Sequence, residues 1–179
     1  MLAILSWEDL APVPWRNGGG VTREIARAEG DSGWLWRLSV ADVGADGPFS
    51  HFPGMTRILT VIEGAGVDLL TPEGTIAARP DRPVAFSGET PVEGRLCAGP
   101  IRNINLIHDA GATTAEVTPL RGPLVLAAGP GPTWVFCRAG PLRAEGRPVP
   151  AGGFAQGAVG PIELGPGAAG LLVRISPRP

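Results

Sequence analysis

Glycine and proline punctuate the whole chain, and this feature most limits what the chain can fold into. The 179 residues include 27 glycines and 20 prolines, which are spread along the sequence rather than gathered in one low-complexity stretch. Both residues disfavour the interior of helices, and the segments between them are short, apolar and rich in β-branched residues. Breakers at intervals of about 8 to 12 residues are typical of sandwiches and barrels built from short strands. We therefore predict an all-β fold.

Charge and hydropathy exclude several classes of protein. A formal net charge of −2 with 44% hydrophobic residues indicates a globular protein with no general attraction for nucleic acid or an anionic membrane. Apolar stretches stay well short of the roughly 20 residues that a membrane span needs. The first residues, MLAILSWEDLAP, lack the features of a signal peptide, so we expect a cytoplasmic protein. Cys97 and Cys137 are far apart, and we expect two free thiols.

The predicted strands fall into two groups. The first group ends with an apolar segment at 101–107, and the small and polar residues from Asp109 to Ala115 have the composition of a linker. Beyond this linker the predicted strands are shorter and carry fewer chemically versatile side chains. This pattern predicts two domains, residues 1–110 and residues 111–179, with the candidate ligand pocket in the first.

The segment from Gly47 to Gly66 forms one wall of the expected pocket. Its apolar run Ile58–Ile62 is bounded by turn residues on both sides, which predicts a buried strand. His51, one of only two histidines in the chain, precedes this strand, and Arg57 stands at its first position. A cation and an imidazole near the start of a buried strand make this segment the first candidate for a ligand-binding site.

Two further segments place polar side chains on one face of a strand. Between residues 34 and 43 apolar residues alternate with Arg37 and Ser39, so these two side chains share a face. Asn103 and Asn105 share a face of the segment 101–107 for the same reason. Asparagine is uncommon in strands, so the pair indicates either local turn bonding or a polar face that lines a lumen. We favour the lumen.

Metal and nucleophile chemistry are weakly supported by the residues. A transition-metal site would need His51 and His108 to converge with carboxylates, because no His-x-His pair exists. A Ser–His–Asp triad can be assembled from Ser39 or Ser50 with His51 and Asp42. The chain lacks the Gly-x-Ser-x-Gly turn that would activate such a serine, so we do not favour this triad.

An anion pocket centred on Arg57 is the third kind of site, with Arg37 beside it. A guanidinium matches a carboxylate with two parallel hydrogen bonds, and the inside of a barrel strengthens those bonds by excluding water. Alternatively, Arg57 caps the end of a strand and faces solvent. Spacing alone does not decide between these two interpretations.

Four blocks of sequence resemble the HutD/Ves family. They follow one another in the family's order and spacing and together cover roughly residues 12–107. The blocks are PWRNGGGVTREI from Pro14, WRLSVADV from Trp36, GPFSHFPG from Gly47 and LTVIEG from Leu59. The first block is the most specific signal, whereas the Glu-Gly turn of the last is common to many cupins.

The resemblance implies a bicupin, with two cupin-like β-barrels of the jelly-roll type in one chain. The family is associated with bacterial histidine utilisation, as a regulator without established catalysis. The suspected ligand is a small carboxylate metabolite such as N-formylglutamate. The resemblance therefore predicts a non-catalytic regulator that binds a compound of this pathway.

Comparison with metal-binding cupins sharpens the expected chemistry. Aligning on the Glu63-Gly64 turn puts His51 and Pro53 where those proteins carry two histidines, and puts Arg57 where they carry a glutamate. A cation at the last position would repel a metal ion and hold a carboxylate. We therefore expect no metal and no cofactor.

The resulting hypothesis names eight ligand-binding residues. Arg57 would anchor the carboxylate, while the others would line or close the pocket: His51, Arg37, Ser39, Asn17, Thr22, Asn103 and Asn105. The alternative function is a metal-independent isomerase or hydrolase that uses His51 as a general base. The expected partner is a small carboxylate metabolite, and the second barrel is a candidate surface for homodimer formation.

Overall fold

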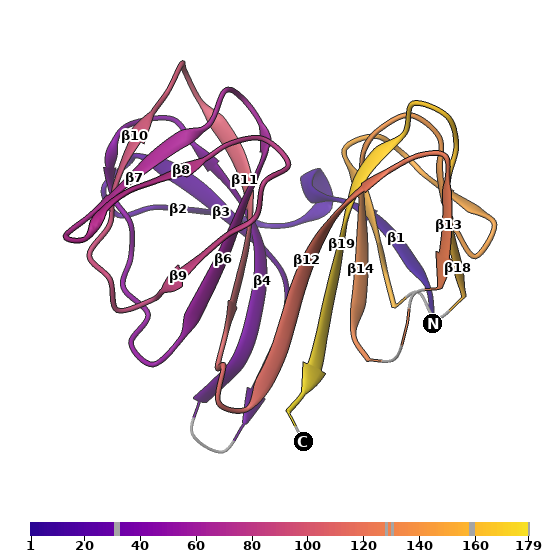
Figure 1. The fold of residues 1–179 in the computed structure, drawn as a ribbon, viewed down its shortest axis with the longest axis horizontal. Coiled ribbons are helices and arrows are strands. Elements are labelled where there is room, and N and C mark those ends of the chain that lie inside the picture. The colour runs from indigo at the N-terminus through magenta and orange to yellow at the C-terminus, as the bar shows by residue number, and fades with distance from the viewer. Residues whose placement is uncertain (31–32, 128, 130, 158–159, 179) are drawn as a thin grey trace. The chain divides into compact units, whose positions relative to one another are not determined.

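The chain is built almost entirely of β-strands. The computed structural model describes residues 1–30, 33–127, 129, 131–157 and 160–178. Among them, the strands are joined by turns and by one short 3-10 helix, η1 (Trp7–Asp9), so the all-β prediction is confirmed. No helix in the described part has the length and apolar character to span a membrane. Contacts divide the chain into two units, Leu10–Thr113, and Met1–Asp9 with Thr114–Pro179 (Figure 1).

The unit formed by Leu10–Thr113 contains two sheets. The larger has the order β2-β3-β4-β11-β6-β9, with bounds β2 (Pro12–Pro14), β3 (Gly20–Gly30), β4 (Gly33–Val43), β11 (Ile101–His108), β6 (Thr56–Glu63) and β9 (Val84–Ser87). The smaller has the order β5-β10-β7-β8, with bounds β5 (Gly47–Pro48), β10 (Glu93–Leu96), β7 (Val67–Thr71) and β8 (Gly74–Ala78). Strands distant in sequence are neighbours here, because β11 lies between β4 and β6.

The two sheets pack on each other through an apolar core. Leu59 and Val61 of β6 belong to the same apolar cluster as Val67 and Leu69 of β7, and all four side chains are fully buried. Each such side chain contributes roughly 1.5–3 kcal/mol to folding by leaving water. Their alternation along each strand fixes which residues face inward, and this places Arg57, two positions before Leu59, on the same inner face.

The other unit is also a pair of sheets. One has the order β1-β17-β14-β19-β12 and the other β13-β18-β15-β16. Among the described residues, no strand of one sheet is hydrogen-bonded in a ladder to a strand of the other sheet of its unit. One isolated bridge, between Val61 and Pro80, lies outside these ladders in the first unit. Each unit is therefore a pair of packed sheets rather than a barrel closed by hydrogen bonds. The bounds are β1 (Ala3–Ser6), β12 (Thr113–Arg121), β13 (Leu124–Ala127), β14 (Thr133–Ala139), β15 (Leu142–Ala144), β16 (Arg147–Val149), β17 (Gly153–Gln156), β18 (Pro161–Leu164) and β19 (Ala169–Pro177).

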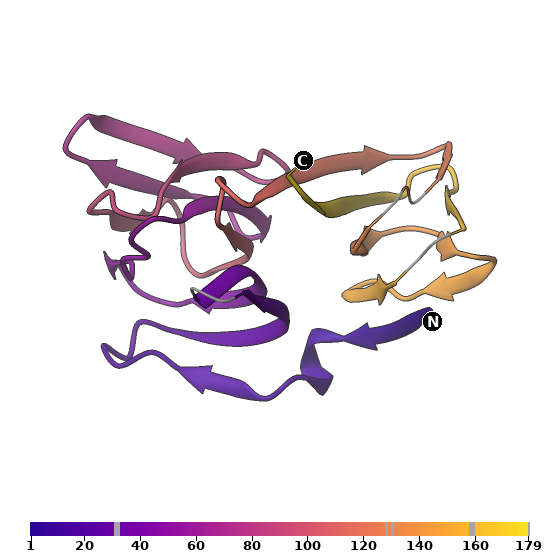
Figure 2. The same cartoon turned by 90° about the horizontal axis from the view of Figure 1, so that it is seen from below.

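The N-terminal strand belongs to the unit formed by the C-terminal half. β1 pairs antiparallel with β17, so that Ala3 lies opposite Gln156 and Ser6 opposite Gly153. Figure 2 shows this indigo strand beside the orange strands of the same unit. From the sequence, residues 1–9 are expected in the first domain, whereas in the structure they belong to the other unit, where Ala3–Ser6 pair with β17. The boundary expected near residue 110 lies close to the observed division at Thr113.

Strand β12 replaces part of the expected linker. It begins at Thr113 and runs to Arg121, although Asp109–Ala115 has the composition of a connecting loop. Its threonines, alanine and proline give a weak apolar signal, and pairing with β19 supplies the backbone hydrogen bonds that form the strand. Asp109 itself turns the chain, because its side chain accepts a hydrogen bond from the Gly111 backbone N–H at 2.8 Å.

An ion-pair network crosses four neighbouring strands at one end of the larger sheet. Asp42 of β4 accepts hydrogen bonds from Arg23 of β3 and Arg102 of β11, each at 2.6 Å. Arg102 also pairs with Glu63 of β6 at 3.2 Å. Burial raises the pKa of Asp42, but the hydrogen bonds and charges of Arg102 and Arg23 outweigh it, so the pKa is lowered. The network therefore favours the folded state while Asp42 is ionised.

We expect Asp42→Asn to destabilise the protein in a pH-dependent way. Because the pKa of Asp42 is lower in the folded state, its contribution is present above the unfolded-state pKa of about 3.9 and disappears as pH falls further. The variant should lose about 1 kcal/mol of unfolding free energy at pH 7, since the carboxylate is partly exposed. Urea denaturation at pH 7 and pH 3 measures this. The exposed Glu73→Gln is the charge-matched control, and an equal deficit for Asp42→Asn at both pH values would contradict the account.

Candidate ligand-binding site

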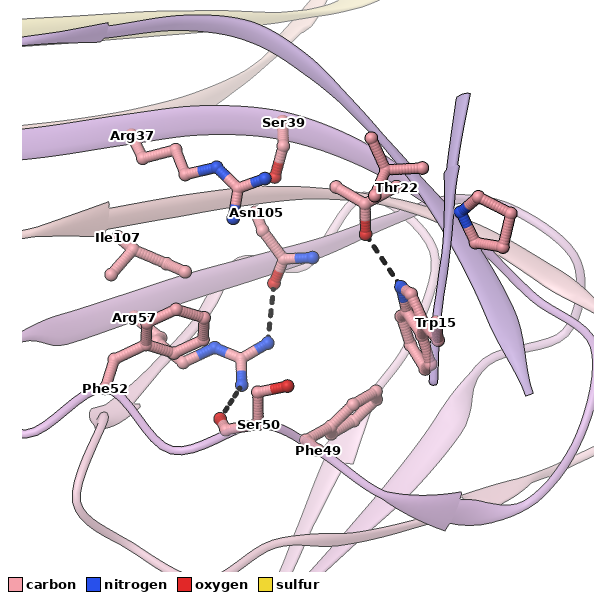
Figure 3. Close-up of a pocket in the computed structure, with 12 residues that line it drawn as sticks. Trp15, Thr22, Arg37, Ser39, Phe49, Ser50, Phe52, Arg57, Asn105 and Ile107 are labelled. Atoms are coloured by element: carbon pink, nitrogen blue, oxygen red, sulfur yellow. Dashed lines mark hydrogen bonds between the residues drawn. The ribbon is translucent and has the colours of Figure 1, made fainter. Parts of the chain in front are cut away.

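A cavity of about 200 Å³ opens on the inner face of the larger sheet. Its walls come from five adjacent strands of that sheet (β2, β3, β4, β11 and β6), from the Trp15 turn and from the strap, our name for residues 49–55 between β5 and β6. Figure 3 shows the lining side chains converging on one space. They are Val13, Pro14, Trp15, Thr22, Arg37, Ser39, Phe49, Ser50, Phe52, Arg57, Asn105 and Ile107.

Strand register brings the polar lining residues together. On β11, Asn105 lies opposite Ser39 of β4, while Ile107 lies between Arg37 of β4 and Arg57 of β6. The pleat turns these positions to the same side of the sheet. Residues as far apart in the sequence as Arg37 and Ile107 therefore share one face of three adjacent strands.

Arg57 is a buried cation held by neutral groups. Its side chain is 5% exposed, and its Nη1 and Nη2 donate to the Ser50 carbonyl at 3.2 Å and to Asn105 Oδ1 at 3.0 Å. The rings of Phe49, Phe52 and Phe86 lie 5.3–5.4 Å from its Cζ. No carboxylate in the described part of the chain pairs with it, and its Nε is buried without a partner. The guanidinium thus retains unused hydrogen-bond donors.

The surroundings of Arg57 make it ready to accept an anion. Burial lowers the pKa of the guanidinium to about 10, so it is still protonated at neutral pH. A charge removed from water without a counter-charge is unfavourable, and the three aromatic rings offset only part of that cost. An anion in the cavity would supply the missing charge. In Figure 3 the two Nη atoms face the side of the cavity where Trp15 stands.

Two asparagines of β11 form a chain of hydrogen bonds that ends at Arg57. Asn105 Nδ2 donates to Asn103 Oδ1 at 2.6 Å, which leaves the Asn105 oxygen to accept from Arg57. Asn103 is fully buried, does not line the cavity, and its Nδ2 has no hydrogen-bond partner in the structure. The sequence predicts both asparagines on a polar lumen face, but only Asn105 lines the cavity, and Asn103 reaches it only through its hydrogen bond to Asn105.

Arg37 also faces the cavity, but its charge is balanced. Its Nε donates to Glu24 Oε2 at 2.8 Å, and its Cζ lies 5.3 Å from the ring centre of Trp34. Beside it the buried Ser39 hydroxyl faces the cavity and makes no hydrogen bond with the described residues. Of the two arginines that line the cavity, Arg37 is paired with a carboxylate and Arg57 is not. The Ser39 hydroxyl is available for a hydrogen bond to a ligand.

The opposite wall of the cavity is mainly aromatic. Trp15 donates from Nε1 to Thr22 Oγ1 at 2.7 Å and meets Phe49 edge-on, with ring centres 6.0 Å apart. Thr22 also lines the cavity, and its hydroxyl proton is left to be donated elsewhere. This wall can hold the apolar body of a ligand whose charged end meets Arg57.

Besides Asn103, two more of the predicted site residues, Asn17 and His51, do not line the cavity. Asn17 is exposed, and its side chain accepts a hydrogen bond from the Gly19 backbone at 3.0 Å, which shapes the glycine turn. His51 is exposed on the outer side of the strap and lines two other surface hollows. Sequence spacing could not show this, because the strap turns Phe49 and Phe52 inward and His51 outward. His51 therefore does not reach a ligand bound at Arg57 in this geometry.

Sequence reasoning missed the aromatic lining. Trp15, Phe49 and Phe52 all stand in the blocks that carry the family resemblance, yet none was assigned to the site. The available signal was the pair of phenylalanines three residues apart around the strap, in a chain with only five phenylalanines. Nothing in their spacing showed that they would pack against a guanidinium. Among the described residues, no group of three His, Cys, Asp or Glu side chains is placed to hold a metal ion.

The fold and the cavity define a cupin-fold protein. The chain superposes on a Cupin 2 conserved barrel domain protein from Leptotrichia buccalis with a TM-score of 0.63 at 10% identity, over 98% of this chain and 96% of that one. The HutD family model matches residues 7–152, and the chain belongs to this family. Likeness to HutD from Pseudomonas fluorescens SBW25 covers the whole of both chains, with a TM-score of 0.87 and 33% identity.

Two curated relatives agree with this assignment. An uncharacterised 21.2 kDa protein in the hutC 3' region of Pseudomonas putida is 44% identical over 60% of this chain. Protein Ves of Escherichia fergusonii is 32% identical over 63% of this chain. The matched part spans 58% and 62% of the length of these two relatives. The resemblance to the HutD/Ves family found in the sequence is confirmed.

We expect Arg57→Met to cost little stability in the absence of ligand. The change removes a buried charge but leaves the Ser50 carbonyl and Asn105 Oδ1 without this donor, so the two effects oppose each other. The unfolding free energy should stay within about 1 kcal/mol of wild type, whereas Leu59→Ala on the same strand face should cost about 2–5 kcal/mol. Urea denaturation compares them. A loss for Arg57→Met as large as that for Leu59→Ala would show that the guanidinium is mainly structural.

Proposed function

We propose that this protein binds a small carboxylate metabolite through Arg57 and acts as a non-catalytic regulator linked to histidine utilisation. One observation carries the binding half of the proposal. Arg57 is a buried, protonated guanidinium at a cavity, and no carboxylate in the described structure neutralises it. Structural arginines that are buried normally pair with an acidic side chain. The counter-charge for this one is best supplied by a ligand.

Carboxylate is the anion that suits the geometry. Ser50 and Asn105 each take one donor of Arg57, so the remaining N–H groups are available to the two oxygens of a carboxylate. The Asn105 and Ser39 side chains stand directly opposite one another on β11 and β4, beside that position. Burial of the guanidinium strengthens each charged hydrogen bond that it makes, because Arg57 itself is largely removed from water.

The size of the cavity favours a small metabolite. A volume of about 200 Å³ is below the range of about 300–1,000 Å³ that is usual for drug-sized ligands. Trp15, Phe49 and Ile107 supply apolar surface for the ligand's carbon chain, while Thr22 and Ser39 supply hydroxyls. N-formylglutamate, the compound that the family resemblance implies, combines carboxylates with a short carbon chain and is our first candidate.

The pathway half of the proposal depends on the relatives. One is named HutD, and another is described by its position in a hutC 3' region. Family membership supports a role in histidine utilisation for this chain as well. The regulatory role is the simplest one for a binding pocket whose only histidine candidate for a general base, His51, faces away from it.

Ligand-induced stabilisation tests the binding half. N-formylglutamate at 100 times its Kd should raise the unfolding free energy by about 2.7 kcal/mol, and the melting temperature with it. Arg57→Met should abolish this shift. Arg95→Met removes the same charge from an exposed position in the same unit and should leave the shift intact. Formate, the condition named for the Pseudomonas fluorescens HutD structure, serves as the smallest carboxylate probe.

Two results would decide against the binding proposal. Stabilisation of Arg57→Met equal to that of wild type would remove Arg57 from the site. The absence of stabilisation of wild type by every small carboxylate tested would remove carboxylates as the ligand class.

The regulatory half requires an experiment in cells. In the source organism, Arg57→Met should change the expression of histidine-degradation genes during growth on histidine as fully as deletion of this gene does. Arg95→Met should behave as wild type. Transcript levels measure both. Normal expression in the deletion strain would contradict a role in this pathway while leaving carboxylate binding untouched.

A further inference from the structure

Phe52 separates the ligand cavity from a second hollow on the other side of the strap. The outer hollow has a volume of about 370 Å³ and is lined by Trp34, His51, Met55 and Asp109 among others. Phe52 is the only residue among the described ones that lines both spaces. One side chain therefore stands between the inner cavity and a larger outer hollow.

The ring of Phe52 lies between two fixed groups. On the inner side its centre is 5.4 Å from Arg57 Cζ, and on the outer side it is 6.3 Å from the ring centre of Trp34. Trp34 is itself covered by Arg37, whose Cζ lies 5.3 Å from the indole centre. Figure 3 shows Phe52 at the end of the cavity opposite Trp15. The ring is thus the end wall of the space that begins at the guanidinium.

The backbone that carries Phe52 is held firmly in place. The Phe52 N–H donates to the Gly88 carbonyl at 2.8 Å, and the Gly88 N–H donates to the Met55 carbonyl at 2.7 Å. A Cβ on Gly88 would clash with the Phe52 carbonyl oxygen, so the two segments are as close as glycine permits. Because the strap is fixed at both of these points, the size of the end wall depends on the side chain of residue 52.

We propose that Phe52 sets the maximum length of the carboxylate that this site accepts, an inference that rests on the proposed function. A carboxylate held by Arg57 extends its carbon chain toward Trp15 or toward Phe52, and the phenyl ring closes the second direction. Ligands that fit the inner cavity bind, and longer acyl chains are excluded. Without the ring, the inner cavity joins the outer hollow, where Trp34 and Met55 offer apolar surface to a longer chain.

Phe86 provides a matched control for this role. Its ring lies 5.3 Å from Arg57 Cζ, as close as that of Phe52, but it lines neither cavity. Phe86→Leu therefore removes one aromatic contact of the guanidinium without opening the end wall. Phe52→Leu removes the same kind of contact and shortens the wall, and Phe52→Ala removes the wall.

The experiment measures affinity for a series of straight-chain monocarboxylates from formate to octanoate by calorimetry. Wild type and Phe86→Leu should share one chain length beyond which binding falls. In Phe52→Ala that limit should move to longer chains, with affinity for the longest members rising at least about tenfold relative to acetate. Phe52→Leu should lie between them and remains informative if Phe52→Ala unfolds, which circular dichroism checks.

Each other outcome overturns the inference. An unchanged length limit in both Phe52 variants leaves the carboxylate site standing but removes Phe52 as its end wall. An equal loss of affinity for all members shows that Phe52 supports Arg57 rather than selecting length. If wild type binds no member of the series or N-formylglutamate, the proposed function fails and this inference fails with it.

Discussion

The burial of the Arg57 guanidinium under three phenylalanine rings is the interaction on which the site depends. Phe49 and Phe52 come from the strap and Phe86 from β9, so one cation contacts both the strap and the edge strand of the sheet. Cation–π contacts and two hydrogen bonds to neutral oxygens make the burial tolerable without a carboxylate. The result is a charged group fixed in the folded state with donors to spare, which is what an anion site requires.

Both the larger sheet and the strap supply groups that hold the Arg57 guanidinium. β11 presents Asn105 to Arg57, and Asn103 behind it fixes which end of the Asn105 amide faces the guanidinium. The strap supplies the Ser50 carbonyl and two rings, and its backbone is tied to Gly88 and Val92. Because the support comes from buried strands and a tethered loop, the site is formed before any ligand arrives. Preorganisation of this kind lowers the cost of binding.

Sequence patterns predicted the parts of the site that follow from strand geometry. A period of two put Arg37 with Ser39 and Asn103 with Asn105, and strand register then brought three of these four to the cavity. The ion pair of Arg37 with Glu24 could not be predicted, because Glu24 stands on the neighbouring strand β3, where irregularities shift the register against β4. The direction of His51 depends on the path of an irregular loop, which no periodicity describes. The pairing of β1 with β17 joins residues about 150 positions apart, beyond the reach of any local pattern.

The most direct measurement of the central claim is the side-chain NMR signal of Arg57 in ¹⁵N-arginine-labelled protein. The chain has no lysine, so its arginines are its only cationic side chains apart from histidine, and the Arg57 signal is assigned by its loss in Arg57→Met. Titration with N-formylglutamate should shift the Arg57 Nε–H resonance to saturation while exposed arginines such as Arg95 stay unchanged. Saturable binding detected by calorimetry with an unmoved Arg57 resonance would contradict the account, because the ligand would then be held elsewhere.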